Sequence, residues 1–291
     1  MEEFTALAIG AFDGLHKGHL KLIEKAKEEK TLKTAVLSFK ENPSLSLTGK
    51  ASYLLTQKDK EKILKENAEV ISFIDFDEVK NISPENFFTQ YIVKKCRAKK
   101  IFCGDNFRFG KNAKGDVNLL QKLANENNID VEILDYELYD GEIISSTRIR
   151  NAVQKGEMQD AKNMLGRYFA FCSKVVKGKQ IGRTLGTPTV NQEIPENFTL
   201  PKFGVYASFV TLEGKKYFGV TNVGTKPSLG KNEPNCETWI LDFDKDIYGV
   251  DIKVELIEFI RAEKKFNSLD DLKEQIIKDV SLAKFFCEKY K

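Results

Sequence analysis

Residues 8–19 read AIGAFDGLHKGH, and this stretch holds the only two histidines of the chain, His16 and His19. A random scatter of two histidines over 291 residues would rarely place them so close together. Glycines lie on both sides of the pair, where they allow the backbone to approach a ligand closely. We therefore interpret the stretch as a phosphate-handling site, and the fold around it follows from its neighbours.

The residues around the pair predict a strand, a turn and a helix in succession. Ala6 to Ile9 is an apolar run typical of a buried parallel strand, Gly10 to Gly18 forms a turn, and His19 to Lys30 has a helical pattern. The N-terminus of such a helix offers backbone N–H groups and a positive dipole end to an anion. Imidazoles three residues apart face the same way there and can donate hydrogen bonds to a phosphoryl group. The alternative, from the residues alone, is an ordinary histidine pair at a helix start.

Short apolar runs alternate with amphipathic stretches over the first part of the chain. This alternation predicts a doubly wound α/β domain with a parallel sheet. The further predicted strands are 34–39, 70–74, 100–103 and 130–134. The further predicted helices are 58–67, 84–95, 117–127 and 158–165.

The pattern changes near Phe169. From there to about Ile260, apolar residues alternate with a period of two, as at Val205, Ala207 and Phe209, and Gly or Pro turns interrupt the runs. Short strands with frequent turns predict a small antiparallel β-barrel.

The chain closes with a predicted amphipathic helix. A capping-box pattern begins at Ser268, and apolar residues then recur at helical spacing. We expect the domain boundary within Gly166 to Ser173, so that residues 1–168 form the α/β domain and residues 169–291 form the barrel domain with its terminal helix.

Composition narrows the class of protein. The formal charge of +3 is small and the lysines are spread along the chain, so we expect no nucleic-acid partner. The five cysteines form no C-x-x-C pair, which argues against a disulfide framework or a zinc site and favours the cytosol. The first residues, Met1-Glu2-Glu3, are acidic where a signal peptide would be basic, and no apolar run reaches the length of a membrane span, so we expect neither a signal peptide nor a membrane partner. The expected state is a monomer or a weak homo-oligomer.

A second glycine-rich stretch lies in the barrel domain, where residues 178–191 read GKQIGRTLGTPTVN. Its glycines let the backbone approach a triphosphate, and Thr189 and Asn191 point to the same side of an extended segment. One oxygen from each can reach the same Mg²⁺ ion, which prefers few protein ligands together with water and phosphate. A plain glycine-proline turn followed by a strand is the alternative.

The first stretch matches the pattern G-x-F-D-G-x-H-x-G-H. It resembles the H-x-G-H nucleotidyltransferases, and among them the bacterial FAD synthetases, which join the α-phosphate of ATP to the phosphate of FMN and release pyrophosphate. The resemblance implies a Rossmann-like fold and a catalytic role for His16 and His19. Neither a Walker loop nor G-x-G-x-x-G occurs in the chain. The ATP-binding residues that the resemblance implies in this stretch are Gly10, Phe12, Asp13, Gly14, His16, Gly18 and His19.

Two further stretches agree with this resemblance. Residues 104–110, GDNFRFG, resemble the family's G-x-x-F-x-F-G loop, in which Asn106 and Phe109 are expected to hold the flavin ring. Residues 145–150, SSTRIR, resemble the S-S-T-x-I-R motif, which implies ATP contacts from Ser146, Thr147 and Arg150. Alternating core aromatics and a plain helix cap are the respective alternatives. The chain departs from the family's F-D-P-x-P pattern at residues 39–43, FKENP, so we leave Lys40 to Asn42 out of the site.

The second glycine-rich stretch resembles the G-R-x-L-G-x-P-T-A-N motif of riboflavin kinases, with Val190 in place of alanine. The resemblance implies that Glu237 is the base that takes the proton from the ribityl hydroxyl of riboflavin, and that Asn222 and Arg261 bind the flavin. A solvated strand carboxylate is the alternative for Glu237. The ATP-binding residues that the resemblance implies here are Gly178, Gly182, Arg183, Gly186, Pro188, Thr189 and Asn191, with Mg²⁺ held by Thr189 and Asn191.

Together the two resemblances cover nearly the whole chain and predict a bifunctional enzyme. The barrel domain is expected to make FMN from riboflavin and ATP, and the α/β domain to make FAD from FMN and a second ATP. Two alternatives stay open at this point. One is an adenylyltransferase for another small phosphate acceptor, and the other is a catalytically inactive flavin-binding regulator.

Overall fold

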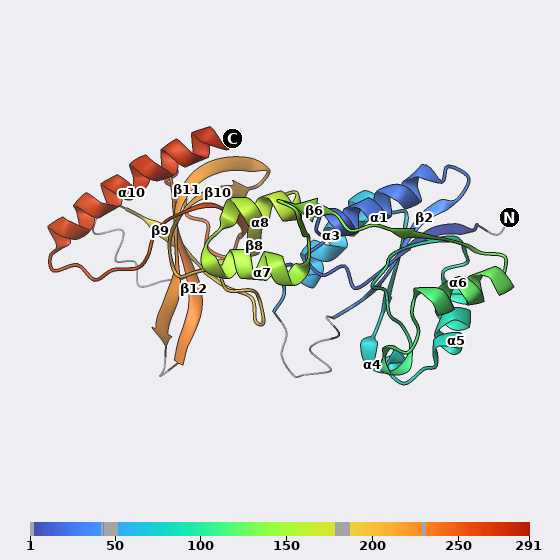
Figure 1. The fold of residues 1–291 in the computed structure, drawn as a ribbon. Helices are drawn as coiled ribbons and strands as arrows, with labels where there is room; N and C mark the ends of the chain where they lie inside the picture. Colours follow the sequence, from blue (N-terminus) through green and yellow to red (C-terminus); the bar gives the residue numbers. More distant parts are fainter. Residues whose placement is uncertain (1–2, 42, 44–51, 178–186, 229–230) are drawn as a thin grey trace. The chain divides into compact units, whose positions relative to one another are not determined.

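The computed structural model describes residues 3–41, 43, 52–177, 187–228 and 231–291. The chain divides into two compact units, Met1–Ser146 and Thr147–Lys291 (Figure 1). The first unit is α/β and the second is a β-barrel with a terminal helix, so the predicted fold class is confirmed.

The first unit is built on a five-stranded parallel sheet with the strand order β3-β2-β1-β4-β5. All five predicted strands are present, with bounds of β1 Thr5–Ile9, β2 Lys33–Phe39, β3 Val70–Ile74, β4 Ala98–Gly104 and β5 Asp130–Leu134. The order reverses between β1 and β4, and such a switch point forms a crevice at the carboxyl ends of the strands. The predicted phosphate and flavin stretches directly follow these two strands.

Helices cover both faces of this sheet (Figure 1). Ala6 and Ala8 of β1 pack in the core beneath α1, while Leu7 and Ile9 pack in the core on the opposite face. This alternation follows from the period of two along a strand. The helices are α1 Lys17–Glu28, α3 Gln57–Asn67, α4 Phe76–Val79, α5 Pro84–Phe87, the π-helical segment η1 Phe88–Lys95 and α6 Val117–Glu126, with a single 3-10 turn, η2, at Lys111–Ala113.

Several features of the first unit differ from the sequence prediction. The helix predicted over 84–95 consists of α5 and the π-helical segment η1, and neither α4 nor η2 was predicted. The helix predicted from His19 begins at Lys17 as α1, because His16 serves as its N-cap. A short hairpin, β6 Leu138–Tyr139 and β7 Glu142–Ile143, was not predicted. Its turn is Asp140-Gly141, and both residues have a positive φ, as a two-residue hairpin turn requires.

The turn between β1 and α1 is sharply bent. Phe12, Gly14 and Leu15 have φ angles of 50°, 77° and 43°. A Cβ atom added to Gly14 would lie 2.8 Å from Cδ1 of Leu54, so this position combines a left-handed backbone with a close neighbour. Glycine is the residue that meets both demands without strain.

The second unit is a closed barrel with the strand order β10-β11-β12-β9-β8-β13. Its strands are β8 Phe169–Val176, β9 Thr189–Glu193, β10 Gly204–Leu212, β11 Lys215–Ser228, β12 Lys231–Ile240 and β13 Asp251–Arg261. Its helices are α7 Ser146–Lys155, α8 Met158–Leu165 and α10 Leu269–Lys289. The predicted terminal helix corresponds to α10, which begins directly after its N-cap Ser268.

The helices that precede the barrel pack with it. The side chain of Gln159 on α8 donates to the carbonyl oxygen of Ile257 on β13 at 2.7 Å. The compact units divide after Ser146, the first residue of α7, upstream of the boundary that we expected at residues 168 and 169. The assignment of the two activities to residues 1–168 and 169–291 stays a prediction.

Hydroxyl groups cross the interior of the barrel. Oγ of Ser208 lies 2.7 Å from Oγ1 of Thr221, which lies 2.9 Å from Oγ1 of Thr238. All three side chains are buried. Because each hydroxyl has a partner on a neighbouring strand, these three buried hydroxyl groups are satisfied.

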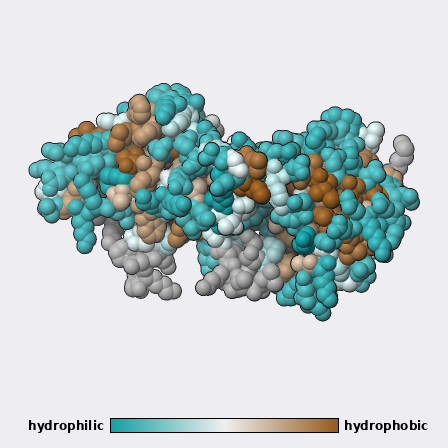
Figure 2. Space-filling model, in the orientation of Figure 1, coloured by the Kyte–Doolittle hydropathy of each residue, from teal (hydrophilic) through white to brown (hydrophobic). Residues whose placement is uncertain are grey.

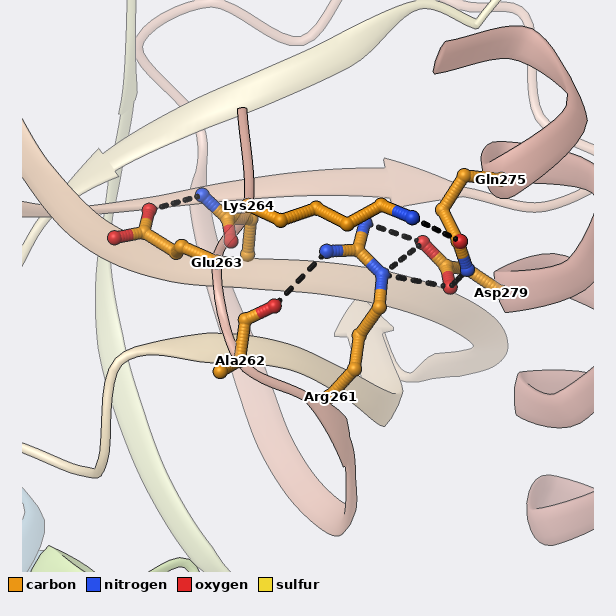
Figure 3. A network of polar contacts seen from close by, with 7 residues as sticks. Arg261, Ala262, Glu263, Lys264, Gln275 and Asp279 are labelled. Carbon is orange, nitrogen blue, oxygen red and sulfur yellow. Dashed lines mark hydrogen bonds and ion pairs between the residues drawn. The ribbon is translucent and has the colours of Figure 1, made fainter. Parts of the chain in front are cut away.

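An ion pair fastens α10 to the barrel, as Figure 3 shows. The guanidinium of Arg261 at the end of β13 donates from Nε and Nη2 to the carboxylate of Asp279, with the shortest contact at 2.7 Å. Its Nη1 donates to the carbonyl oxygen of Ala262, and Gln275 donates to Asp279 at 2.8 Å. The carboxylate of Asp279 is buried, so it depends on these donors.

Polar side chains dominate the visible face of each unit in Figure 2, and apolar side chains gather in separate patches. On α10 the exposed large apolar residues are Leu269, Ile277, Leu282 and Phe285. Within the described residues no helix has the length and apolar character to cross a lipid bilayer.

Replacing Asp279 with alanine is expected to loosen α10. The change leaves the guanidinium of Arg261 without its carboxylate, and we expect a loss of about 2 kcal/mol in the free energy of unfolding, below the range for a fully buried pair because Arg261 is partly exposed. Urea titration followed by circular dichroism measures this loss. Lys278→Ala, an exposed neighbour on the same helix, is the control and is expected to change stability by less than about 0.5 kcal/mol. Equal effects of the two variants would contradict the role of the ion pair.

Replacing Gly14 with alanine is expected to destabilise the first unit through two separate causes. Gly141→Ala is the matched control, since Gly141 has a φ of 74° and no atom lies within 4 Å of an added Cβ. The control measures the backbone cost alone, which is about 1 kcal/mol for a left-handed residue. Thermal unfolding should show a further loss of roughly 1 kcal/mol for Gly14→Ala, because its Cβ meets Leu54. Equal losses would show that the neighbouring side chain moves aside freely.

Candidate functional site

A pocket of about 860 Å³ opens in the first unit at the carboxyl edge of the sheet. Every strand of the parallel sheet contributes to its wall where the strand ends, as expected for the switch point between β1 and β4. The contributing residues at these ends are Ile9, Phe39, Ile74, Gly104 and Leu134. The sheet topology thereby brings two stretches that are distant in sequence, residues 8–19 and 104–110, to one cavity.

The two histidines lie together at the N-terminus of α1, and both line this pocket. Nδ1 of His16 accepts a hydrogen bond of 3.4 Å from the backbone N–H of His19, which caps the helix. The imidazole rings stack with their centroids 3.6 Å apart and an interplanar angle of 16°. The ring of Phe12 meets His19 edge-on at 5.3 Å. The pair therefore sits at the positive end of the helix dipole, where an anion is stabilised.

Side chains from other elements hold the carbonyl groups of the turn before α1. Oγ of Ser146 donates to the carbonyl oxygen of Asp13 at 2.8 Å. Oγ of Ser38, near the end of β2, donates to the carbonyl oxygen of Ala11 at 3.0 Å. These bonds fix the turn from both sides, so the positions of the histidines are set before any ligand binds.

The predicted ATP-binding residues of the first unit fall into two groups. The residues that line the pocket are Gly10, His16, Gly18, His19 and Ser146. The others support the turn: Phe12 is fully buried, Asp13 supplies a bonded carbonyl, and Gly14 packs on Leu54. Thr147 and Arg150 lie on α7, whose residues from Thr147 on belong to the second compact unit.

The predicted flavin residues Asn106 and Phe109 both line the pocket. Phe109 is mostly buried in the core, and its ring stacks on that of Phe107, with centroids 5.5 Å apart and an angle of 13°. Tyr136 lines the pocket as well, and a hydrogen bond with Asp105 raises the pKa of its phenol. An aromatic wall beside amide and phenol groups suits a planar heterocycle.

In the second unit, strand register gathers three predicted kinase residues. Glu237 on β12 pairs with Asn191 on β9 and, on its other side, with Asn222 on β11. Residues directly opposite one another project to the same face of a sheet, so the three side chains form one row. Thr189 lies two residues before Asn191 and shares its face. Nδ2 of Asn235 approaches Oε1 of Glu237 at 3.5 Å.

Asn191 shows an unusual environment. Its side chain is buried, and within the described part of the chain its Oδ1 accepts no hydrogen bond. A buried polar oxygen normally has a partner, and leaving it without one is costly. An oxygen donor in this state, beside the hydroxyl of Thr189, fits the ligand set that Mg²⁺ prefers.

The remaining predicted kinase residues are placed as follows. Asn222 donates to Oε1 of Glu263 at 3.2 Å, and Arg261 is held by Asp279 as described above. Pro188 directly precedes β9. The predicted residues Gly178, Gly182, Arg183 and Gly186 lie outside the described residues, as does Asn42 of the divergent loop.

Sequence reasoning missed several residues of the first site. Lys60 and Ser38 reach the turn from elements far along the chain, and Tyr136 and Ile143 line the pocket from the segment around the hairpin. Lys60 has many lysines around it in the sequence and looks like part of a solvated helix face. Its burial is a tertiary effect that no local pattern indicates.

Comparison with known proteins assigns each part of the chain to a family. A family model described as FAD synthetase matches residues 1–148, and one described as riboflavin kinase matches residues 165–287. The first match contains the pocket with its histidine pair. The second contains the row of Asn191, Glu237 and Asn222.

Proteins named "Bifunctional riboflavin kinase/FMN adenylyltransferase" match almost the entire chain. The protein of Escherichia coli strain K12 is 36% identical over 98% of this chain and 93% of its own length. The protein of Listeria monocytogenes is 32% identical over 97% of this chain and 92% of its own length. The protein of Bacillus subtilis is 34% identical over 94% of this chain and 90% of its own length.

A solved structure has the same fold over nearly its full length. It is described as a macrolide-efflux protein from Streptococcus pneumoniae, and it matches with a TM-score of 0.89 and 30% identity over 98% of this chain and 95% of its own. That description applies to the Streptococcus protein, whereas the two family models and the relatives above agree with one another on flavin nucleotides. On this evidence the chain belongs to the family of bifunctional riboflavin kinase/FMN adenylyltransferases.

Proposed function

We propose that this chain makes FMN from riboflavin and ATP in its second unit, and FAD from FMN and a second ATP in its first unit. The observation that carries the proposal is that the residues of each sequence motif lie together in the folded chain, one group in each unit. The paired histidines lie on a pocket of the first unit, and the Glu237 row lies on the barrel of the second. Each unit thus contains its own set of groups suited to phosphate chemistry.

Adenylyl transfer in the first unit depends on positioning and charge. The phosphate of FMN attacks the α-phosphate of ATP and pyrophosphate leaves, without a covalent enzyme intermediate. His16 and His19 stabilise the charge that develops on the transferred phosphoryl group, and the N-terminus of α1 adds its dipole. Asn106 and Phe109 hold the flavin ring against the apolar wall of the pocket.

Phosphoryl transfer in the second unit uses a carboxylate. Glu237 accepts the proton of the ribityl 5′-hydroxyl as the hydroxyl oxygen attacks the γ-phosphate of ATP and ADP leaves. Asn222 and Arg261 hold the flavin. In the structure Asn222 and Arg261 are paired with Glu263 and Asp279, which sets their orientation.

Mg²⁺ fits the second site. Thr189 and the unsatisfied Oδ1 of Asn191 hold the ion in this proposal, with phosphate oxygens and water completing its shell. A bound Mg²⁺ supplies charge neutralisation for the triphosphate. The predicted ATP contacts of Gly178, Gly182, Arg183 and Gly186 belong to the same proposal.

The compartment, the partners and the assembly of the enzyme belong to the same proposal. None of the five cysteines forms a disulfide, which supports a reducing compartment such as the cytosol. We propose small molecules as the partners, with no nucleic acid or membrane, and a monomer or weak homo-oligomer as the assembly. The two other functions, transfer to another phosphate acceptor and flavin binding without catalysis, have no observation of their own in favour.

Incubation with riboflavin, ATP and Mg²⁺ is expected to yield FMN first and FAD later. Chromatography of the three flavins over time measures both steps. A reaction that yields no FMN would remove the kinase, and FMN without FAD would remove the transferase. Binding of flavin without any product would favour the regulator instead, and adenylylation of a different phosphate ester in preference to FMN would favour the other acceptor.

The two units should fail separately when their own residues are changed. Glu237→Gln is expected to lower FMN formation by about 10²- to 10⁴-fold, because the amide cannot accept the proton. It should spare FAD formation from supplied FMN. His19→Ala is expected to lower FAD formation by roughly 10²- to 10³-fold, because a donor to the transferred phosphoryl group is lost, and to spare the kinase. Initial rates of each half-reaction give the comparison.

Glu274→Gln, an exposed carboxylate on α10, is the matched control for Glu237→Gln and should leave both rates unchanged. Circular dichroism of each variant checks that the unit carrying the substitution is folded. If either active-site variant slowed both reactions equally while the chain stayed folded, the division into two sites would be wrong.

A further inference from the structure

Lys60 is a buried cation of the first unit with no role in the chemistry above. It lies on α3 and is only 9% exposed. Its Nζ donates to the carbonyl oxygen of Ala11 at 2.8 Å and to that of Phe39 at 3.0 Å. The ring of Phe73 on β3 lies 5.8 Å from the same nitrogen. Lysine is almost never buried unless its charge is compensated, so this arrangement calls for an explanation.

Both acceptors of Lys60 belong to the wall of the nucleotide pocket. Ala11 follows β1, Phe39 ends β2, and both residues line the pocket. Lys60 itself does not line the pocket, so its ammonium lies behind the wall to which Ala11 and Phe39 belong. The ammonium therefore joins the carboxyl ends of two neighbouring strands at the point where the histidine turn begins.

We propose that Lys60 is a positioning residue of the adenylyltransferase, which holds the ends of β1 and β2 in the geometry that receives the triphosphate of ATP and places a positive charge behind them. The inference rests on the proposed function of the first unit. A charge enclosed by protein acts on an anion more strongly than a lysine in water does, because the surrounding dielectric screens it less. Lys60 acts through Ala11 and Phe39 and through its field.

The protonation of Lys60 makes ATP binding depend on pH. Burial lowers the pKa of Lys60 to about 8, and the carboxylate of Asp13 partly opposes that shift. The negative charge of a bound triphosphate raises the pKa again, so ATP binding and protonation of Lys60 favour each other. ATP therefore binds less tightly as the pH rises above about 8.

Among the described residues, the other charged groups near Lys60 do not account for this pH dependence. Asp13, in the turn after β1, is the charged side chain whose field acts on the ammonium. On α3 the neighbouring carboxylates of Asp59 and Glu61 accept hydrogen bonds from Thr56 and Gln57. The elements β2 and β3 face Nζ with the carbonyl oxygen of Phe39 and the ring of Phe73, which are neutral.

Loss of stability does not explain the expected weakening of ATP binding above about pH 8. The pKa of Lys60 is about 8 in the folded chain and 10.5 as the ordinary value. The cost of burying the charge is present below about pH 8 and is lost as the pH rises toward 10.5, so deprotonation of Lys60 stabilises the fold in that range. Activity that falls while stability does not fall therefore points to ligand binding.

The test measures kcat and KM for ATP in FAD formation from supplied FMN, with the full chain, from about pH 7 to about pH 9.5. The variants are Lys60→Met, which removes the charge, and Lys60→Arg, whose guanidinium keeps its charge over the whole range. Lys65→Met is the matched control, since Lys65 lies on the same helix with 71% of its side chain exposed. Thermal unfolding followed by circular dichroism checks that each variant is folded, and FMN formation checks that the second unit is unaffected.

For the wild type we expect kcat/KM for ATP to fall by up to about tenfold per pH unit above pH 8. Lys60→Met should have a KM for ATP about tenfold higher near pH 7, with kcat within about threefold, and no fall above pH 8. Lys60→Arg should recover most of the loss near pH 7 and also lack the fall. Lys65→Met should behave as the wild type.

An unchanged KM and an unchanged pH profile in Lys60→Met would overturn the inference. So would a variant that loses stability and kcat with no effect on the pH profile, because that result describes a purely structural lysine. If Lys60→Met fails to fold, the wild-type profile and that of Lys60→Arg decide, since a wild type with no fall above pH 8 also overturns it. A wild type that forms no FAD refutes the proposed function. In that case proton uptake on binding of ATP near pH 8, measured by calorimetry in buffers of different ionisation enthalpy, still tests Lys60.

Discussion

The first unit depends on how the chain leaves β1. The backbone turns through positive φ angles at Phe12, Gly14 and Leu15 before α1 begins, and such angles are costly for residues other than glycine. Hydrogen bonds from distant side chains to the carbonyl oxygens of Ala11 and Asp13 hold the turn in this form. The histidine pair, the start of α1 and the floor of the pocket all follow from that turn.

The two proposed sites are built from different structural features. The first unit places a helix N-terminus and stacked imidazoles at the end of a parallel sheet. The barrel contains no histidine, and its proposed site is a row of side chains on adjacent antiparallel strands. At the carboxyl ends of a parallel sheet, backbone N–H groups of a helix N-terminus face the ligand, whereas a barrel surface presents a row of side chains at fixed spacing.

Local patterns were sufficient for the five strands of the parallel sheet, for the barrel as a class of fold and for the histidine stretch, because hydrophobic period and glycine placement act over a few residues. The Asp140-Gly141 turn is typical of a hairpin, but the two strands beside it are too short to show an alternation of apolar and polar residues. The partners of Lys60, Asn222 and Arg261 were not predictable, since each contact joins elements that meet only in the folded chain. The same limit applies to the unsatisfied oxygen of Asn191.

The row consists of Asn191 on β9, Glu237 on β12 and Asn222 on β11, so each of its residues comes from a different strand. A slip of one residue in either pairing would turn the side chains of the displaced strand to the opposite face. The row therefore exists only once the barrel has closed in the correct register. A chain still folding, or one trapped with a shifted strand, lacks the complete row on which the proposed kinase site depends.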